Sequence, residues 1–190
     1  MKRRPDLVAR YADRVARIDR TVFLDRVKVR FPAMLGVALL SAGSVVGLII
    51  LWVAAGQGHP LRELAALVGM GALLVCTHNL GHFVVGSLTG IRFTDWFADL
   101  PRRPQPGLKI DYASYLRAPA RSRAWMHASG AIVTKIVPFA ALLYAVAIGC
   151  EGWALLLLLV LGIVQIVTDL AWSVKASDWK KFRREMRLAR

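Results

Sequence analysis

Four apolar stretches, each close to the thickness of a lipid bilayer, constrain this chain more than any other feature. They cover residues 33–55, 61–88, 124–148 and 152–172. A helix needs about 20 apolar residues to cross the hydrocarbon core of a membrane. Because 56% of the 190 residues are hydrophobic, a water-soluble domain of this length would have too little interior to hide them. The sequence therefore predicts an all-α integral membrane protein with four transmembrane helices.

The three longer segments outside these spans are more polar, and each has its own pattern of residues. Residues 1–30 place apolar side chains near helical spacing among many arginines, which predicts either a basic amphipathic helix on the membrane surface or a solvated, partly helical leader. Residues 91–117 form a flap, in which 91–97 and 108–112 are short extended segments around a turn rich in proline and glycine. This pattern favours a small β-hairpin. Residues 176–190 read as a charged helical tail.

The placement of lysine and arginine predicts the topology. Ten of the 26 basic residues precede the first span, seven lie between the second and third spans, and seven follow the fourth. With four spans, all of these segments lie on one side of the membrane, which the positive-inside rule assigns to the cytoplasm. We therefore expect the membrane domain, residues 31–175, to lie in the cell (inner) membrane with both termini cytoplasmic. This arrangement accounts for a net charge of +14 without a nucleic-acid partner.

Two histidines in the second span predict a metal site. His78 and His82 stand four residues apart, so they lie one turn apart on the same face of a helix. At a rise of about 1.5 Å per residue, His78 lies roughly 26 Å past the start of its span, and Asp169 lies at about the same depth in the fourth span. Ionisable side chains within a membrane are costly unless they are paired or coordinated. Two histidines and one carboxylate, with the fourth position left to water, are a common catalytic zinc set, so we expect Zn²⁺ at this site.

Two further polar residues are expected near this depth. His127 lies at the cytoplasmic start of the third span, where it is either an extra ligand, a partner of the ligands, or an ordinary interfacial histidine. Lys135 lies too deep in that span for its ammonium to reach the surface easily. It is expected to pair with Asp169 or with a substrate carbonyl, or to point into a polar cleft.

The order and spacing of three segments resemble the site-2 protease family of intramembrane zinc metalloproteases, in particular its small zincin-type members. The segments are THNLGHFVVGSLTGIRF (77–93), APARSRAWMHASGAIVT (118–134) and VTDLAWS (167–173). In that family the first segment carries His-Glu-x-x-His and the last carries an aspartate ligand. The resemblance implies that His78, His82 and Asp169 bind zinc. It also implies that the substrate is a transmembrane peptide, cleaved near the cytoplasmic face.

The chain departs from this family at the positions that perform the chemistry. Asn79 stands where the family has its general-base glutamate, and an amide has no useful proton affinity near neutral pH. A bound zinc would still lower the pKa of its water, so slow hydrolysis is compatible with the sequence. Thr134 stands where the family has an asparagine that assists substrate binding, and Leu170 follows the aspartate in place of glycine.

These departures leave two functional hypotheses open. The first is a zinc metallopeptidase-like protein that cleaves membrane-spanning peptides or, with Asn79, only binds them. The second is a catalytically inactive membrane scaffold or regulator that keeps the fold. A purely structural interpretation, with the histidines packed between spans, must treat the common depth of His78, His82 and Asp169 as coincidence. A di-iron lipid-modifying enzyme would need many more histidines than the four present.

Overall fold

The structure is a computed structural model that describes residues 2, 4–99, 103–171 and 177–189, without the side chains of residues 103–105 and 169–171. Helices and strands follow one another along the chain in this order: α1 (Pro5–Arg26), β1 (Val29–Pro32), α2 (Ala33–Ala54), α3 (Leu61–Leu88), β2 (Phe93–Asp99), β3 (Arg103–Ile110), α4 (Tyr112–Arg117), α5 (Ala120–Ala147), α6 (Gly152–Ala171) and α7 (Asp178–Leu188).

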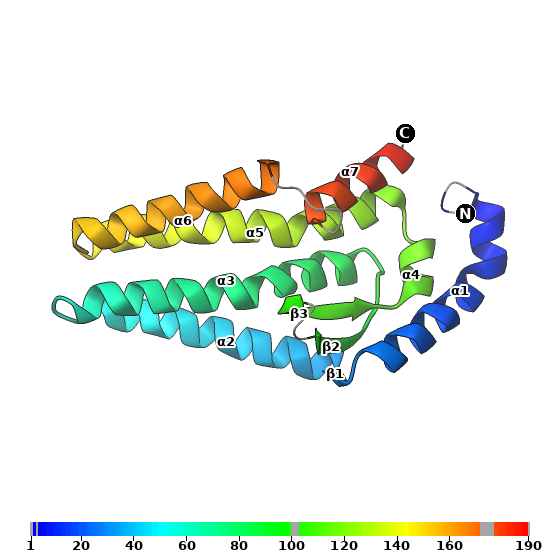
Figure 1. Ribbon diagram of the computed structural model, residues 1–190, viewed down its shortest axis with the longest axis horizontal. Coiled ribbons are helices and arrows are strands. Elements are labelled where there is room, and N and C mark those ends of the chain that lie inside the picture. Colours follow the sequence, from blue (N-terminus) through cyan, green and yellow to red (C-terminus); the bar gives the residue numbers. More distant parts are fainter. Residues whose placement is uncertain (1, 3, 100–102, 172–176, 190) are drawn as a thin grey trace.

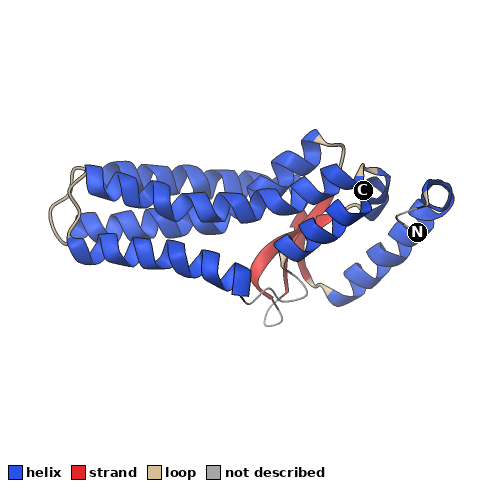
Figure 2. Ribbon diagram, turned by 90° about the horizontal axis from the view of Figure 1, so that it is seen from above, coloured by secondary structure: helices blue, strands red, loops and turns tan. Residues whose placement is uncertain are grey.

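The long helices form two hairpins that lie side by side. α2 pairs with α3, α5 pairs with α6, and the contact between α3 and α5 joins the two hairpins (Figure 1). The sheet, α1, α4 and α7 gather at one end of this bundle, together with both chain termini (Figures 1 and 2). The opposite end consists of the two tight loops between the paired helices. Polar elements and apolar elements are thus separated along the long axis of the molecule.

The protein is mostly helical, and three of its helices are long and apolar enough to cross a membrane. These are α2, α3 and α5; the described apolar part of α6, Gly152–Thr168, is shorter. A buried core holds the four helices together, and its members include Leu51, Met70, Ala141 and Leu158. Many large apolar side chains on the outer faces of the same helices are exposed, as expected for a surface in contact with lipid.

The sequence predicts a two-stranded hairpin, whereas the structure contains a three-stranded antiparallel sheet with one strand more. β2 and β3 form the hairpin, and β1 adds to the other edge of β2, with Phe31 opposite Trp96. Helical spacing predicts residues 29 and 30 as the end of the N-terminal helix. Instead α1 ends at Arg26, and the aromatic rings of Phe31 and Trp96 stack 5.7 Å apart between their centroids. This cross-strand contact stabilises the strand, and sequence periodicity does not reveal it.

A turn at Gly90 reverses the chain between the end of α3 and the start of β2. Gly90 has a φ of +80°, in the left-handed region that favours glycine at a helix C-terminus. The Ile91 amide then donates to the Gly86 carbonyl at 2.9 Å, and Ile91 is buried beside Tyr115 and Met126. This turn positions β2 and β3 next to the last turns of α3, where both histidines lie.

Candidate metal centre

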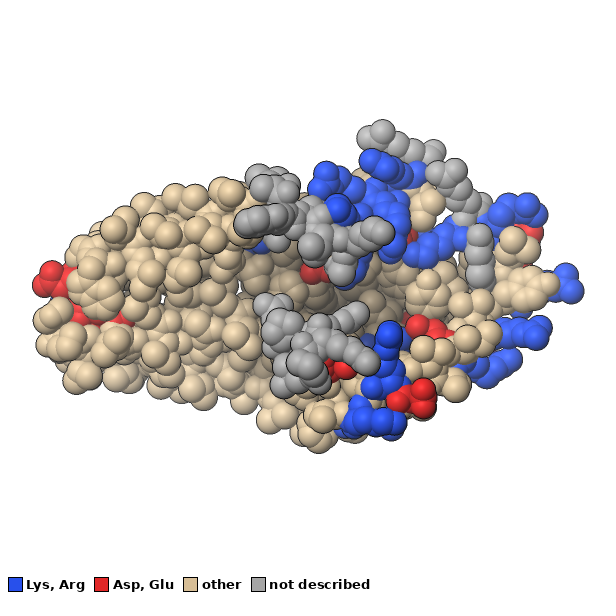
Figure 3. Space-filling model, in the orientation of Figure 1, with Lys and Arg blue, Asp and Glu red and all other residues tan. Residues whose placement is uncertain are grey.

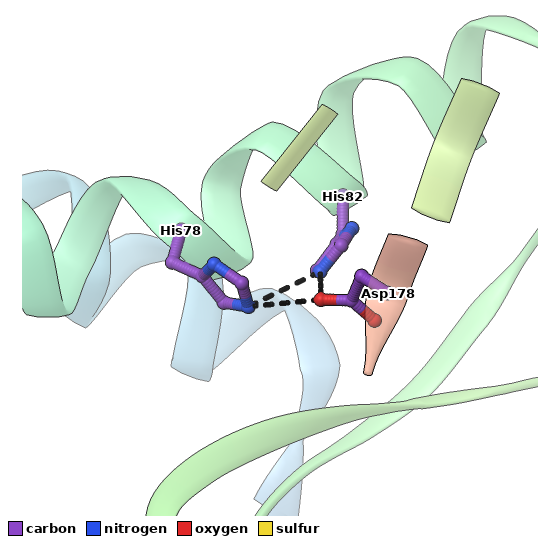
Figure 4. Close-up of side chains that lie close together, drawn as sticks. All are labelled: His78, His82 and Asp178. Carbon is purple, nitrogen blue, oxygen red and sulfur yellow. Dashed lines mark hydrogen bonds and ion pairs between the residues drawn. The ribbon is translucent and has the colours of Figure 1, made fainter. Parts of the chain in front are cut away.

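Three side chains from two helices converge at the polar end of the bundle. His78 and His82 come from α3, and Asp178 comes from the first turn of α7 (Figure 4). Nε2 of His82 lies 3.2 Å from Nε2 of His78 and 3.2 Å from Oδ2 of Asp178. Nε2 of His78 lies 3.5 Å from the same Asp178 oxygen. Each residue therefore points one donor atom at a common centre.

The size of this triangle fits a small divalent cation. Zinc bonds to histidine nitrogen and carboxylate oxygen measure about 2.0–2.2 Å, so a tetrahedral arrangement separates neighbouring ligand atoms by about 3.3–3.5 Å. The three separations of 3.2, 3.2 and 3.5 Å match that spacing. Two imidazole nitrogens and one carboxylate oxygen are also the donor types that zinc prefers. Both the geometry and the chemistry of the described residues fit the metal.

The other ring nitrogen of His82 determines which tautomer faces this centre. Nδ1 of His82 lies 2.6 Å from the Met126 carbonyl oxygen, which only accepts hydrogen bonds, so Nδ1 carries the proton. In the neutral ring Nε2 then has a lone pair, and it faces the carboxylate oxygen of Asp178. Nε2 of His82 and Oδ2 of Asp178, 3.2 Å apart, attract each other only when a proton on Nε2 or a metal cation lies between them. A backbone carbonyl in this position is a usual orienting partner of metal-binding histidines.

The close crossing of α3 and α5 makes room for the histidine rings. A Cβ atom on Gly81 would lie 3.2 Å from the Gly130 backbone, so the two glycines allow the helices to approach. The Ser129 hydroxyl lies 2.9 Å from the Gly81 carbonyl across the same contact. A Cβ atom on Gly130 would lie 2.5 Å from Nε2 of His82. The absence of a side chain at Gly130 is therefore what leaves space for the ligand atom.

Replacing Gly130 with alanine should weaken any metal binding at this triangle, because the added methyl group would overlap the Nε2 atom of His82. Gly71→Ala is the matched control: Gly71 lies in α3, and a Cβ atom added there would have no neighbour within 4 Å, so zinc content should not change. Elemental analysis of both purified variants, beside thermal unfolding, measures the two effects. Equal zinc in the parent and in Gly130→Ala would contradict this geometry.

The environment of Asp178 suits it to metal binding. Oδ1 of Asp178 accepts from Nζ of Lys181 at 2.9 Å, which leaves Oδ2 directed at the histidines. Burial by itself would raise the pKa of Asp178, but the hydrogen bond with His82 and the charge of Lys181 outweigh it and hold that pKa below its ordinary value. The carboxyl group is therefore ionised, as a metal ligand must be.

A second polar cluster holds α7 in place. Glu185 is fully buried, about two turns beyond Asp178 on the same face of α7. Its carboxylate accepts from Nε of Arg123 at 2.7 Å, from the Tyr115 hydroxyl at 3.0 Å and from Nζ of Lys2 at 2.5 Å. These partners come from α5, from α4 and from the segment before α1. Because α7 packs mainly on α5, this cluster sets the position of the helix that carries Asp178.

The structure assigns different surroundings to the other predicted site residues. Asp169 belongs to the last turn of α6, but its side chain lies outside the described residues, so its role as a ligand stays a prediction. Nε2 of His127 lies 3.0 Å from the Tyr115 hydroxyl, which places His127 in the Glu185 cluster and outside the donor triangle. Thr134 donates to backbone carbonyls of its own helix. Lys135 lies within electrostatic range of His78.

Asn79 has a structural contact at the position of the expected general base. It is 6% exposed, and its Nδ2 donates to the Pro106 carbonyl of β3 at 3.0 Å. A glutamate carboxylate could not make this bond, because a carboxylate and a carbonyl are both acceptors. Pro106 also lacks an N–H group, so β3 offers no backbone donor there. The amide therefore ties the outer edge of the sheet to the helix that carries the histidines.

Sequence reasoning does not single out Asp178, although the chain contains a signal for it. The tail after the fourth span holds seven basic residues and only two acidic ones, Asp178 and Glu185. Both acidic side chains lie at the centre of a polar cluster in the fold. Ser177, whose hydroxyl accepts from the Lys180 amide, also marks Asp178 as the first residue of a helix. The position of Asp178 beside α3 follows from tertiary packing alone.

The chain was compared with known protein families, curated proteins and solved structures. No family model, no curated protein and no solved structure matches it.

Proposed function

We propose that the protein is a membrane-embedded zinc protein of the site-2 protease type, which binds membrane-spanning peptides near the cytoplasmic face and hydrolyses them slowly at most. The observation that carries this proposal is the triangle of donor atoms from His78, His82 and Asp178, with separations of 3.2–3.5 Å. When bound there, zinc would supply a Lewis acid and lower the pKa of a bound water. Asn79 cannot take a proton from that water, so hydrolysis lacks its usual base.

The proposed topology has four spans in the cell membrane, with both termini and the metal site on the cytoplasmic side. In this proposal the fourth span is α6, which lies along α5 (Figure 1). Lysines and arginines gather at the sheet end, whereas an uncharged belt covers the long helices on the face shown in Figure 3. This separation supports the orientation through the positive-inside rule. The site then lies at the cytoplasmic edge of the bilayer, next to the sheet.

One contact favours a second candidate function, a non-cleaving scaffold or regulator. The Asn79 amide is buried and bonded to Pro106, so this residue stabilises the sheet in a way that a catalytic glutamate would not. Asn79→Glu separates the two candidates. For a peptidase-like protein, a restored base should raise cleavage of a membrane peptide by about 10²–10⁴-fold. Zinc binding without any gain in cleavage would favour the scaffold.

Metal analysis of the detergent-purified full chain tests the proposal. We expect about one zinc per chain in the parent, as for a mononuclear site, and almost none in His78→Ala. His59→Ala is the matched control, because His59 lies in the loop at the opposite end of the bundle and its side chain is 58% exposed. The same donor types also bind ferrous iron, which elemental analysis distinguishes. A parent protein that holds no metal even after reloading would refute the proposal.

A further inference from the structure

Outside the four apolar helices, the described part of the chain exposes large apolar side chains in one region. Among the described residues, all such side chains lie on α1 or β1: Ile18 is 60% exposed, Val22 57%, Val29 54% and Phe31 44%. Scattered single apolar residues on a surface need no explanation, but a connected group usually marks an interaction site. Ile18 and Val22 are one turn apart on α1, and Val29 and Phe31 share one face of β1.

This exposed group is continuous with the lipid-facing surface of the bundle. β1 ends at Pro32 and α2 begins at Ala33, and the next exposed apolar side chains are Met34 and Leu35 in the first turn of α2. Figure 1 shows the C-terminal half of α1, β1 and the start of α2 following one another along one edge of the molecule. A surface that begins in the bilayer therefore extends onto α1.

The opposite side of α1 is already occupied by the protein. Phe23 and Val27 are buried against Phe97 of the sheet, and the Phe23 and Phe97 rings meet edge to face at 5.3 Å. Arg20 forms an ion pair with the buried Asp95 on β2. These contacts fix the rotation of α1 about its own axis. Ile18 and Val22 consequently cannot turn inward, and they stay directed away from the sheet.

Basic side chains surround the exposed apolar group. Arg14, Arg17, Arg26 and Lys28 are exposed, and none of them has an ion-pair partner among the described residues. Arg14 precedes Ile18 by one helical turn, and Arg26 follows Val22 by one turn. Apolar residues flanked by unpaired cations are typical of helices that lie at the surface of membranes with anionic lipids. Each such cation near an anionic surface is worth about 1 kcal/mol, or roughly a fivefold change in affinity.

We propose that the C-terminal half of α1 and β1 form a docking surface for the anionic phospholipid headgroups of the bilayer that holds the spans. Ile18, Val22 and Phe31 enter the interfacial region, and the four basic side chains bind lipid phosphates. This inference goes beyond the zinc site, and it does not depend on metal binding. It assigns a role to the surplus of positive charge that is specific to this edge of the molecule.

Amide hydrogen exchange of the full chain in lipid nanodiscs tests the proposal. One set of nanodiscs contains phosphatidylcholine alone, and a second contains phosphatidylcholine mixed with phosphatidylglycerol. We expect amides of residues 14–31 to exchange at least about fivefold more slowly in the anionic discs, and high salt should abolish the difference. Equal exchange in both lipids would overturn the proposal. Protection that requires two protein copies per disc would also overturn it, because a second copy would then be the occupant.

Matched variants identify the side chains responsible. The double substitution Arg17→Gln with Arg26→Gln should remove most of the protection that anionic lipid adds. Arg183→Gln with Arg187→Gln is the control, since these two arginines are also exposed and their replacement removes the same charge, but they lie on α7. The control should leave residues 14–31 unaffected. An equal loss of protection in both pairs would show that net charge and not this surface attracts the lipid, and no loss in the α1 pair would overturn the proposal.

Discussion

Asp178→Ala is expected to lower zinc affinity by more than about 100-fold, since loss of residues that only orient a ligand already costs about 10–100-fold. Oδ2 of Asp178 is one of three donor atoms directed at the proposed metal position. Without it, two histidine nitrogens remain, which is fewer than the three protein ligands of usual catalytic zinc sites. Competition with a chromophoric chelator measures the affinity in detergent solution.

Asp169→Ala is the decisive companion variant, because the sequence alone selects Asp169 as the third ligand. Three protein donors complete a usual catalytic zinc set, so Asp169→Ala keeps its zinc if His78, His82 and Asp178 are the ligands, and loses it if Asp169 is a ligand as well. The opposite pattern, with zinc lost in Asp169→Ala and retained in Asp178→Ala, would support the sequence-based ligand set over the one in the structure. Asp178→Asn preserves the size of the side chain, so it separates loss of the ligand charge from loss of packing in α7.

Glu185→Ala is expected to destabilise the folded protein by about 3–5 kcal/mol, the usual result of breaking a buried ion pair from one side. Arg123 is 3% exposed and would remain charged with no carboxylate to bind. Denaturant titration in detergent measures this loss. Asp25→Ala is the control: Asp25 is an exposed carboxylate on α1, where a change within about 0.5 kcal/mol is expected. A loss of similar size in both variants would contradict a special role for Glu185.

The contribution of Glu185 should also depend on pH in a defined direction. Burial alone would raise the pKa of Glu185, but hydrogen bonds from Lys2 and Arg123 outweigh it and hold the pKa below its ordinary value of 4.5. A carboxyl group with a lowered pKa stabilises the fold above its unfolded pKa, and this stabilisation is lost as the pH falls through the folded pKa. The stability gap between the parent and Glu185→Gln should therefore narrow below about pH 4.5. A gap independent of pH would contradict this ionic role.

Much of the fold could be predicted because its signals are local. Long apolar runs specify α2, α3 and α5 directly, since crossing a bilayer requires a helix of about that length. The alternating residues predict β2, but the stretch rich in proline and glycine that was predicted as a turn lies largely within β3. β1 could not be predicted, because four residues are too few to show a periodic pattern. These residues form a strand through their pairing with β2. Strand pairing of this kind depends on residues almost 70 positions apart in the chain.

The site was predictable on one helix and not on the other. His78 and His82 share a face of α3 by their spacing alone, so a short stretch of sequence determines two of the three donors. The third donor required knowledge of how α7 docks on α5, which depends on the Glu185 cluster and on the α3–α5 crossing at Gly81 and Gly130. Asp169 was predicted as a ligand from its depth along the fourth predicted span. The same calculation cannot place Asp178, because α7 is not part of any predicted span.

The sequence by itself determined the long helices, three of which are long and apolar enough to cross a membrane, and the shared face of the histidine pair. Each of these follows from the pattern of residues within a single helix. Only the tertiary structure decided that the Asp178 carboxylate meets the histidines, where the Asn79 amide binds and which face of α1 stays exposed. These features depend on contacts between segments far apart in the chain. Helix periodicity determines which residues share a face, but packing determines what that face meets.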